Sequence, residues 1–274
     1  MKLIRRTLLF LALIAQMWFC AVAAPALGQS GPEGPLDHPE QTLVSANQLM
    51  SACARYNSLN TRIRDGKIDS ASARIELRRL LAEVRDEYYR AGGGAFAPSD
   101  WVFPLAGYDA HAIGGGKRHG YIARGYDFFR GNLHGGHPSY DIFIRDRNQD
   151  GLDDRSGNPV KVLSVTGGIV VALEGEWEPD SRLKGGKYIW VYDPTNDLLV
   201  YYAHNAELHV TLGEIVRPGD VLAVVGRSGF NAAKRRSPTH LHLSVLKVTD
   251  GKVAPVKAFP ALQRASSPSR VTAG

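Results

Sequence analysis

Hydrophobic residues follow three different patterns along the chain. Residues 7–23 form an almost continuous apolar run. In residues 41–90, apolar positions recur at three- and four-residue steps, which predicts amphipathic helices. After the glycines at 92–94, short runs of β-branched and aromatic residues alternate with Gly, Asp, Asn and Pro, which is typical of strands joined by turns. We therefore expect an N-terminal apolar segment, a helical part and a β-rich part.

The helical part is expected to form two helices. Gly66 interrupts the periodic pattern, and Asp69 or Ser70 is suited to cap the second helix. Cys53 lies on an apolar stripe, which indicates packing rather than chemistry. The two stripes consist of Leu43, Ala46, Leu49, Cys53 and Tyr56, and of Leu77, Leu80, Val84 and Tyr88. We predict a helical hairpin over residues 41–94, preceded by a Gly- and Pro-rich linker at 29–40.

The β-rich part is expected to span residues 95–262. Its strand candidates are residues 141–144, 160–165, 169–173, 188–192, 199–203, 208–210, 221–225 and 241–248. Many short strands with turn signals between them predict a mainly β fold, an antiparallel β-sandwich or partly open barrel. Residues 263–274 contain Ser, Pro and Ala and are expected to be a disordered tail.

The N-terminal apolar run has the features of a secretory signal peptide. Lys2, Arg5 and Arg6 precede it, and the small residues Ala-Val-Ala at 21–23 offer a cleavage site. The alternative is a membrane-anchoring helix, but the run is short for a span of about 20 residues. We predict a signal peptide over residues 1–28, export to the periplasm or the outside, and no stable membrane insertion after cleavage.

Removal of this segment changes the charge balance and the cysteine count. It takes away three of the 33 Lys and Arg residues and none of the 27 Asp and Glu residues, so the net charge falls from +6 to +3. This small excess gives little support to a nucleic-acid partner, and we predict none. Only Cys53 remains, so an intrachain disulfide is excluded and stability must come from the core or from a metal.

Several histidines fall at positions that suit a metal site or a catalytic pair. His240 and His242 lie two apart in a predicted strand, so both point to the same face. His137 and Asp141 stand four apart where another strand begins, and His204 ends an apolar run. Each feature alone is weak, because a lone histidine is more often a surface or core residue, and a solvated strand face would also explain the pair. A catalytic zinc needs three protein ligands, which such a set could supply.

The order of these features resembles the lysostaphin-like, or LytM-type, zinc metallopeptidases of family M23. The family pattern HxGxD is similar to "HPSYD", YxHL to "YYAHN", and HLHF to "HLHL". Between them, "VKVLSVTGGIVVAL" and "VTLGEIVRPGDVLAVVGRSG" resemble the family's strand-turn-strand and Gly-rich stretches. Two positions depart from the family: Ser139 replaces the Gly of the first motif, and Leu243 leads to Ser244 where an acidic residue often follows.

The resemblance implies a set of site residues and a chemistry. His137, Asp141 and His242 would hold one zinc ion per chain, and His204 and His240 would be catalytic histidines. A zinc ion with this ligand set activates water and polarises a scissile carbonyl. A nearby histidine can then take a proton or stabilise the oxyanion. His134 has no assigned role and is expected to line the cleft, with an exchange of ligands as the alternative.

The function implied is an exported zinc metalloendopeptidase that hydrolyses peptide bonds in peptidoglycan cross-links or stem peptides. The alternative is a LytM-fold protein that activates another cell-wall hydrolase without cutting anything. The hairpin could occlude the cleft, dock the enzyme or dimerise it. Because every candidate ligand lies beyond residue 94, a chain that starts near Ala95 is expected to bind zinc.

A second metal site is conceivable in the acidic stretch "DRNQDGLDD". Asp146, Asn148 and Asp150 alternate as in a calcium loop, and Gly151 permits a sharp turn. Gly157 stands where such a loop would carry its final acid. A solvated acidic loop is the alternative, so Ca²⁺ at these three residues is the weaker of the two metal predictions.

Overall fold

The computed structural model describes residues 39–116 and 119–267. The predicted signal peptide at 1–28 lies outside these residues, as does nearly all of the predicted linker. In the described part, no helix has the length and apolar character that a membrane span requires. The α-helices are α1 (Pro39–Arg64), α2 (Ser70–Arg90) and α3 (Phe259–Arg264). Short 3₁₀ helices are η1 (Pro98–Asp100), η2 (Ala110–Ala112) and η4 (Phe128–Leu133).

The strands make one antiparallel sheet that is not closed into a barrel. They are β1 (Ser139–Phe143), β2 (Lys161–Leu163), β3 (Gly168–Glu174), β4 (Lys187–Asp193), β5 (Leu198–Leu208), β6 (Ile215–Val216), β7 (Val221–Val225), β8 (His240–Thr249) and β9 (Lys252–Pro255). The main path runs β1-β8-β5-β4-β3-β6, while β7 joins β2 to β5 and β9 pairs with β8. The predicted mainly β, antiparallel fold with an N-terminal helical hairpin is confirmed.

The predicted hairpin forms as α1 and α2. Asp69 is the N-cap of α2, and its side chain accepts hydrogen bonds from the backbone of Ala71 and Ser72. Gly66, between the helices, has a φ of +66°, which glycine adopts without strain. Cys53 is buried, and burial raises the pKa of its thiol to about 12. These observations agree with a packing role for Cys53.

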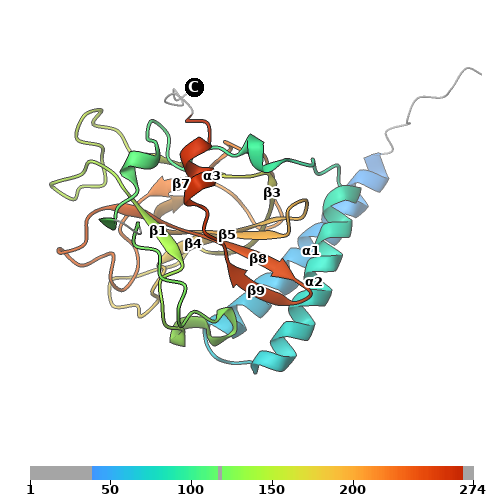
Figure 1. The fold of residues 1–274 in the computed structure, drawn as a ribbon. Helices are drawn as coiled ribbons and strands as arrows, with labels where there is room; N and C mark the ends of the chain where they lie inside the picture. The colour runs from blue at the N-terminus through green and yellow to red at the C-terminus, as the bar shows by residue number, and fades with distance from the viewer. Residues whose placement is uncertain (1–38, 117–118, 268–274) are drawn as a thin grey trace, which may run out of the picture. The chain divides into compact units, whose positions relative to one another are not determined.

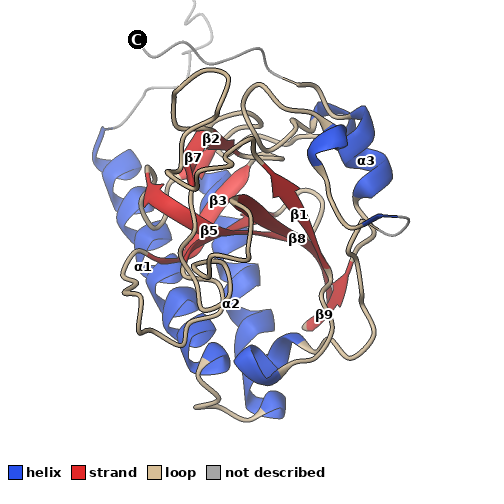
Figure 2. Ribbon diagram, turned by 90° about the vertical axis from the view of Figure 1, so that its left-hand side faces the viewer, coloured by secondary structure: helices blue, strands red, loops and turns tan. Residues whose placement is uncertain are grey.

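The hairpin covers one face of the sheet, and α3 lies against the other (Figures 1 and 2). Tyr56 and Leu59 of α1 belong to the same apolar cluster as Val171 and Trp190 of the sheet. On β8, Leu241, Leu243 and Val245 belong to the cluster on the opposite face. The alternation of strand side chains therefore places His240, His242 and Ser244 on the hairpin side.

This shared cluster bears on the expectation that the hairpin is separable. A chain that starts near Ala95 would expose the apolar sheet face that α1 and α2 cover. A surface of that kind favours aggregation or a loosened native state. The hairpin and the sheet therefore share an apolar cluster, and zinc binding by the shortened chain stays a prediction.

Some predicted boundaries differ from the observed elements. The predicted strand at 208–210 is wrong, because Leu208 is the last residue of β5. The short strands β6 and β9 and the helix α3 were not predicted. The predicted tail starts at residue 263, but α3 continues to Arg264 and the Ser266 amide donates to the Trp101 carbonyl. Ordered structure therefore extends at least to Ser266.

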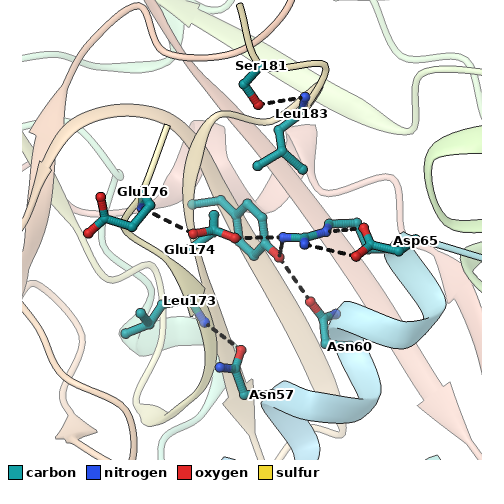
Figure 3. A network of polar contacts seen from close by, with 10 residues as sticks. Asn57, Asn60, Asp65, Leu173, Glu174, Glu176, Ser181 and Leu183 are labelled. Carbon is teal, nitrogen blue, oxygen red and sulfur yellow. Dashed lines mark hydrogen bonds and ion pairs between the residues drawn. The ribbon is translucent and has the colours of Figure 1, made fainter. Parts of the chain in front are cut away.

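A polar network ties the end of α1 to the sheet (Figure 3). The Arg64 guanidinium contacts Asp65, and its Nη1 lies 2.8 Å from Glu174 Oε2 and 3.1 Å from the Tyr188 hydroxyl. The Tyr188 hydroxyl donates to Asn60 Oδ1 over 3.3 Å. The side chains of Arg64 and Glu174 are only 17% and 23% exposed, so water screens this ion pair incompletely.

We expect Arg64→Met to lower the free energy of unfolding by roughly 1.5–3 kcal/mol, because it removes charge-assisted hydrogen bonds in a half-buried network. The matched control is Arg79→Met, which breaks an exposed pair with Glu83 on α2 and should cost no more than about 0.5 kcal/mol. Urea unfolding of both variants measures the difference. Equal losses would show that the Arg64 network contributes no more than a surface pair.

Candidate metal centre

Strand pairing brings two distant parts of the chain together. In the β1–β8 ladder, Asp141 stands opposite His242, and Phe143 stands opposite His240. On the other side of β8, Ala203 of β5 stands opposite His242. His137 precedes β1, and its backbone N–H and C=O both pair with Ile122. The antiparallel register thus sets Asp141 beside His242, 101 residues away.

Three donor atoms converge at this point. Asp141 Oδ1 lies 3.0 Å from His242 Nδ1 and 3.4 Å from His137 Nε2. The ligand atoms of these three residues all lie within 4.8 Å of one another, and no other such group of His, Cys, Asp or Glu occurs in the described residues. Two imidazoles and one carboxylate suit a catalytic type of zinc site with an open position. The donor set therefore fits the predicted zinc.

The histidine tautomers follow from backbone contacts. His137 Nδ1 lies 3.0 Å from the Gly120 carbonyl. A carbonyl only accepts hydrogen bonds, so Nδ1 is the donor and Nε2 is the nitrogen available to the site. In His242, Nδ1 is the nitrogen that faces Asp141. Each predicted ligand thus presents a defined atom.

The two predicted catalytic histidines lie next to this group. His204 Nδ1 is 2.8 Å from the Ser228 carbonyl, and His240 Nδ1 is 2.7 Å from the Pro238 carbonyl. Both imidazoles therefore keep Nε2 free, and they are 8% and 7% exposed. The His204 ring centroid lies 4.9 Å from that of His240 and 5.4 Å from that of His242. His240 Nε2 is 3.7 Å from Asp141 Oδ1 but lies outside the three-donor group.

The protonation of these groups follows from burial and mutual contacts. Burial alone would raise the pKa of Asp141, but hydrogen bonds from His137 and His242 outweigh it and hold that pKa well below its usual value. Burial would lower the pKa of His137, but the contact with Asp141 raises it. Burial lowers the pKa of His242, and it lowers the pKa of His204 well below its usual value. At neutral pH, Asp141 is therefore ionised and His204 is neutral.

His204 is held in an uncommon backbone conformation. Its φ is +68° inside β5, where a residue other than glycine is strained. Its N–H donates to the Gly185 carbonyl. Gly229 approaches the ring so closely that a Cβ there would lie 2.8 Å from His204 Nδ1 and 2.5 Å from the Lys184 carbonyl. The position of the His204 ring thus depends on the absence of a side chain at Gly229.

We expect Gly229→Ala to lower stability by about 1–3 kcal/mol and to reduce turnover, because the new methyl displaces His204 and Gly229 has a φ of +111°. The control is Gly157→Ala, where φ is +67° and a Cβ would meet no neighbour within 4 Å. Urea unfolding and steady-state kinetics measure both effects. If the two variants behave alike, the close approach to His204 is not what makes Gly229 necessary.

The two positions that depart from the family motifs contact each other. Ser139 and Ser244 stand opposite in the β1–β8 ladder, two pairs along from Asp141 and His242. Their hydroxyl oxygens lie 2.6 Å apart, and the residues are 1% and 5% exposed. A glycine at 139 would leave the buried Ser244 hydroxyl without this partner, which is costly. The two departures are therefore complementary.

A pocket of about 130 Å³ adjoins the donor group. His137 and His242 line it, together with Tyr188, Trp190 and Tyr201 of the sheet. The rings of Trp190 and Tyr201 stack with centroids 4.5 Å apart, and the Tyr201 centroid is 6.1 Å from that of His242. The predicted cleft-lining role of His134 is supported, because His134 also borders the pocket.

Most residues of this pocket carry no signal in the sequence. Tyr188, Trp190 and Tyr201 lie in predicted strands, where aromatic residues usually belong to the core. Asn60, Ile63 and Arg64 of α1 also line the pocket, although they are more than 70 residues away from His137 in the chain. No local motif links a helix end to a strand face, so only the tertiary arrangement reveals these residues.

The predicted calcium loop receives no support. The Asp146 carboxylate already accepts hydrogen bonds from the amides of Asp150 and Gly151 and from the Thr239 hydroxyl. Asn148 presents its amide N–H₂ to Asp150, so it is not oriented as an oxygen ligand. The hydrogen bond from the Thr239 hydroxyl to Asp146 also holds in place the residue that precedes His240.

This chain is similar to known proteins in part of its sequence. Residues 147–255 match the sequence model of Peptidase family M23. The match includes His204, His240 and His242, and it begins after His137 and Asp141. No curated protein matches the chain.

Three solved structures are distant neighbours of this chain. A Ruminococcus gnavus protein, provisionally named glycyl-glycine endopeptidase LytM, has 19% identity and a TM-score of 0.40 over 85% of this chain and 93% of its own. The catalytic domain of the antimicrobial peptidase lysostaphin from Staphylococcus simulans has 20% identity and a TM-score of 0.33, covering 47% and 80%. A zinc-containing peptidase from Vibrio cholerae has 17% identity and a TM-score of 0.33, covering 64% and 41%.

Proposed function

We infer, from the match of residues 147–255 to the model of Peptidase family M23 together with the site geometry, that this chain is an exported zinc metalloendopeptidase that cuts peptide bonds of peptidoglycan. The observation that carries the inference is the convergence of His137, Asp141 and His242, with His204 and His240 beside them. Because the family includes non-catalytic members, the support for catalysis in this chain is the local geometry, which sets two further buried imidazoles beside a complete donor set.

Each residue has a distinct task in this proposal. His137 Nε2, Asp141 Oδ1 and His242 Nδ1 would hold a zinc ion. When bound, zinc supplies Lewis-acid chemistry, which favours ionisation of water and polarises a carbonyl. His204 and His240 each have a free, unprotonated Nε2, so either can accept a proton from the attacking water, and the imidazolium that forms can then donate that proton to the leaving amine.

The buried state of the catalytic histidines suits this chemistry. Burial lowers the pKa of His204, so its imidazole is neutral at neutral pH and its Nε2 lone pair is available to accept a proton. The Ser228 and Pro238 carbonyls hold the Nδ1 protons of His204 and His240 and stabilise an imidazolium once it forms.

The test is zymography on purified peptidoglycan with and without a chelator, followed by mass analysis of the fragments. We expect lysis that the chelator abolishes and zinc restores, with fragments cut in the peptide portion. Fragments cut only in the glycan would contradict the assignment.

The second candidate is a LytM-fold activator of another wall hydrolase. Zinc content discriminates the two, since near-stoichiometric zinc together with lysis favours the enzyme. An activator would leave purified peptidoglycan intact and would increase lysis only when a second hydrolase is added. N-terminal sequencing of the exported protein tests the predicted signal peptide separately.

A further inference from the structure

The pocket beside the donor group is built from three parts of the molecule. The first is the sheet with the donor group, which contributes Tyr188, Trp190 and Tyr201 of β4 and β5 together with His137 and His242. The second is η4 with the β3–β4 loop, where Phe128 and Leu183 add apolar surface. The third is the end of α1. A peptide bound at the donor group therefore has this pocket directly beside it.

The end of α1 forms one wall of the pocket and also supports the neighbouring η4 segment. Ile63 is 2% exposed and borders the pocket. Gly131 of η4 packs so tightly on this turn that a Cβ there would lie 2.2 Å from the Ile63 carbonyl. The end of α1 thus supplies one wall and supports the η4 segment that carries Phe128. Without the hairpin, two of the three parts would change.

The charges around the pocket disfavour a charged occupant. Arg64 lines it, but its guanidinium is already paired with Glu174 and Asp65. Lys184 lies at the border, and its ammonium donates to the Asn132 carbonyl. A buried carboxylate or ammonium would lose its hydration there without a dedicated counter-ion. Aromatic and aliphatic surface instead favours an apolar group.

We propose that this pocket receives an apolar side chain of the peptide substrate, next to the bond that is cut, and that α1 is part of the substrate-binding site. This proposal rests on the proposed peptidase function. A volume of about 130 Å³ is enough for a side chain of leucine size. Each methylene buried there should improve binding about fourfold, so leucine should be preferred over glycine by at least about tenfold.

The test uses blocked peptides Ac-Gly-Gly-Xaa-Gly-Gly-NH₂, with Xaa as Gly, Asp, and both enantiomers of Ala, Leu and Phe. Binding is measured by calorimetry on the zinc-free full chain, because the pocket is formed by protein groups alone. Cleavage is measured on the zinc-loaded chain. We expect the order Leu, Ala, Gly for one enantiomer, with Asp no better than Gly.

Two pairs of variants separate the pocket from general stability. Ile63→Ala enlarges the α1 wall and should shift the preference from Leu toward Phe. Its control is Leu59→Ala, which removes a similar buried group from the same helix but does not line the pocket. Leu183→Trp should fill the pocket and abolish the preference, whereas Arg182→Trp, its exposed neighbour, should keep it.

The outcomes test the pocket proposal and the peptidase function separately. A binding preference for Leu without cleavage of these peptides would support the pocket, and zymography on peptidoglycan would then decide the peptidase function separately. The pocket proposal would be overturned if the chain cleaved the peptides without preferring Leu. It would also be overturned if Ile63→Ala and Leu183→Trp left the preference for Leu unchanged. Neither outcome would contradict the peptidase function. If Leu183→Trp does not fold, as seen in its melting temperature, Asn132→Trp on the η4 side replaces it.

Discussion

A His242→Ala protein is expected to keep its fold, to lose its zinc and to lose all measurable peptidase activity. His242 Nδ1 is one of the three donor atoms that converge in the described residues, and it lies 3.0 Å from Asp141 Oδ1. Loss of an outer partner of a ligand already costs about 10–100-fold in metal affinity, so loss of the ligand itself should cost more. Zinc per chain is measured by mass spectrometry after dialysis, and the fold by circular dichroism.

The control for this experiment is His209→Ala. His209 is an exposed histidine whose ring contacts Glu207, outside the donor group. The His209→Ala variant should bind as much zinc as the parent chain. A loss of zinc in this variant would point to the number of histidines rather than to the site. Near-stoichiometric zinc in a His137→Ala/His242→Ala double variant would refute the assignment of the metal centre.

Removing either predicted catalytic histidine should have a different signature. We expect His204→Ala and His240→Ala to retain zinc and fold while turnover falls by roughly 10²–10⁴-fold, the usual contribution of one acid–base partner. The reason is geometric: the rings adjoin the donor group, but neither belongs to it. Zinc content and kcat are measured on the same preparations, again with His209→Ala as the control.

The two variants also test which histidine of β8 binds the metal and which is catalytic, that is, the assignment of His242 and His240. His240 Nε2 is 3.7 Å from Asp141 Oδ1, so His240 is the residue best placed to act as a ligand instead. A loss of zinc in His240→Ala, comparable to that in His242→Ala, would show that the two roles are exchanged. Unchanged turnover in His204→Ala would remove that residue from the mechanism.

Local pattern was sufficient for the strands that carry the site. Alternation predicts that His240 and His242 share a face, and the opposite face of β8 is indeed apolar with Leu241, Leu243 and Val245. Most predicted strands differ from the observed ones by one or two residues at either end. These features depend on neighbours in sequence, so the sequence contains the information directly.

Features that depend on distant neighbours were not predictable in this way. β5 continues past Ala203 because it changes partner, from β8 to β7, within one strand. The positive φ of His204 occurs next to this change of partner, and nothing in "YYAHNAEL" signals it. Likewise, Ser139 and Ser244 each look like an isolated departure, although the register makes them a bonded pair.

Because β1 pairs with β8, the candidate metal centre links two residues that are far apart in the sequence. Asp141 and His242 are 101 residues apart, and nearly the whole sheet lies between them. Closing such a loop is entropically costly, and an ion that binds both ends is bound only by the native chain. At a free zinc concentration 1,000 times the dissociation constant, mass action would add about 4 kcal/mol to stability. The concentration of zinc in the compartment would then set how often the native sheet opens, and with it the lifetime of the protein among proteases.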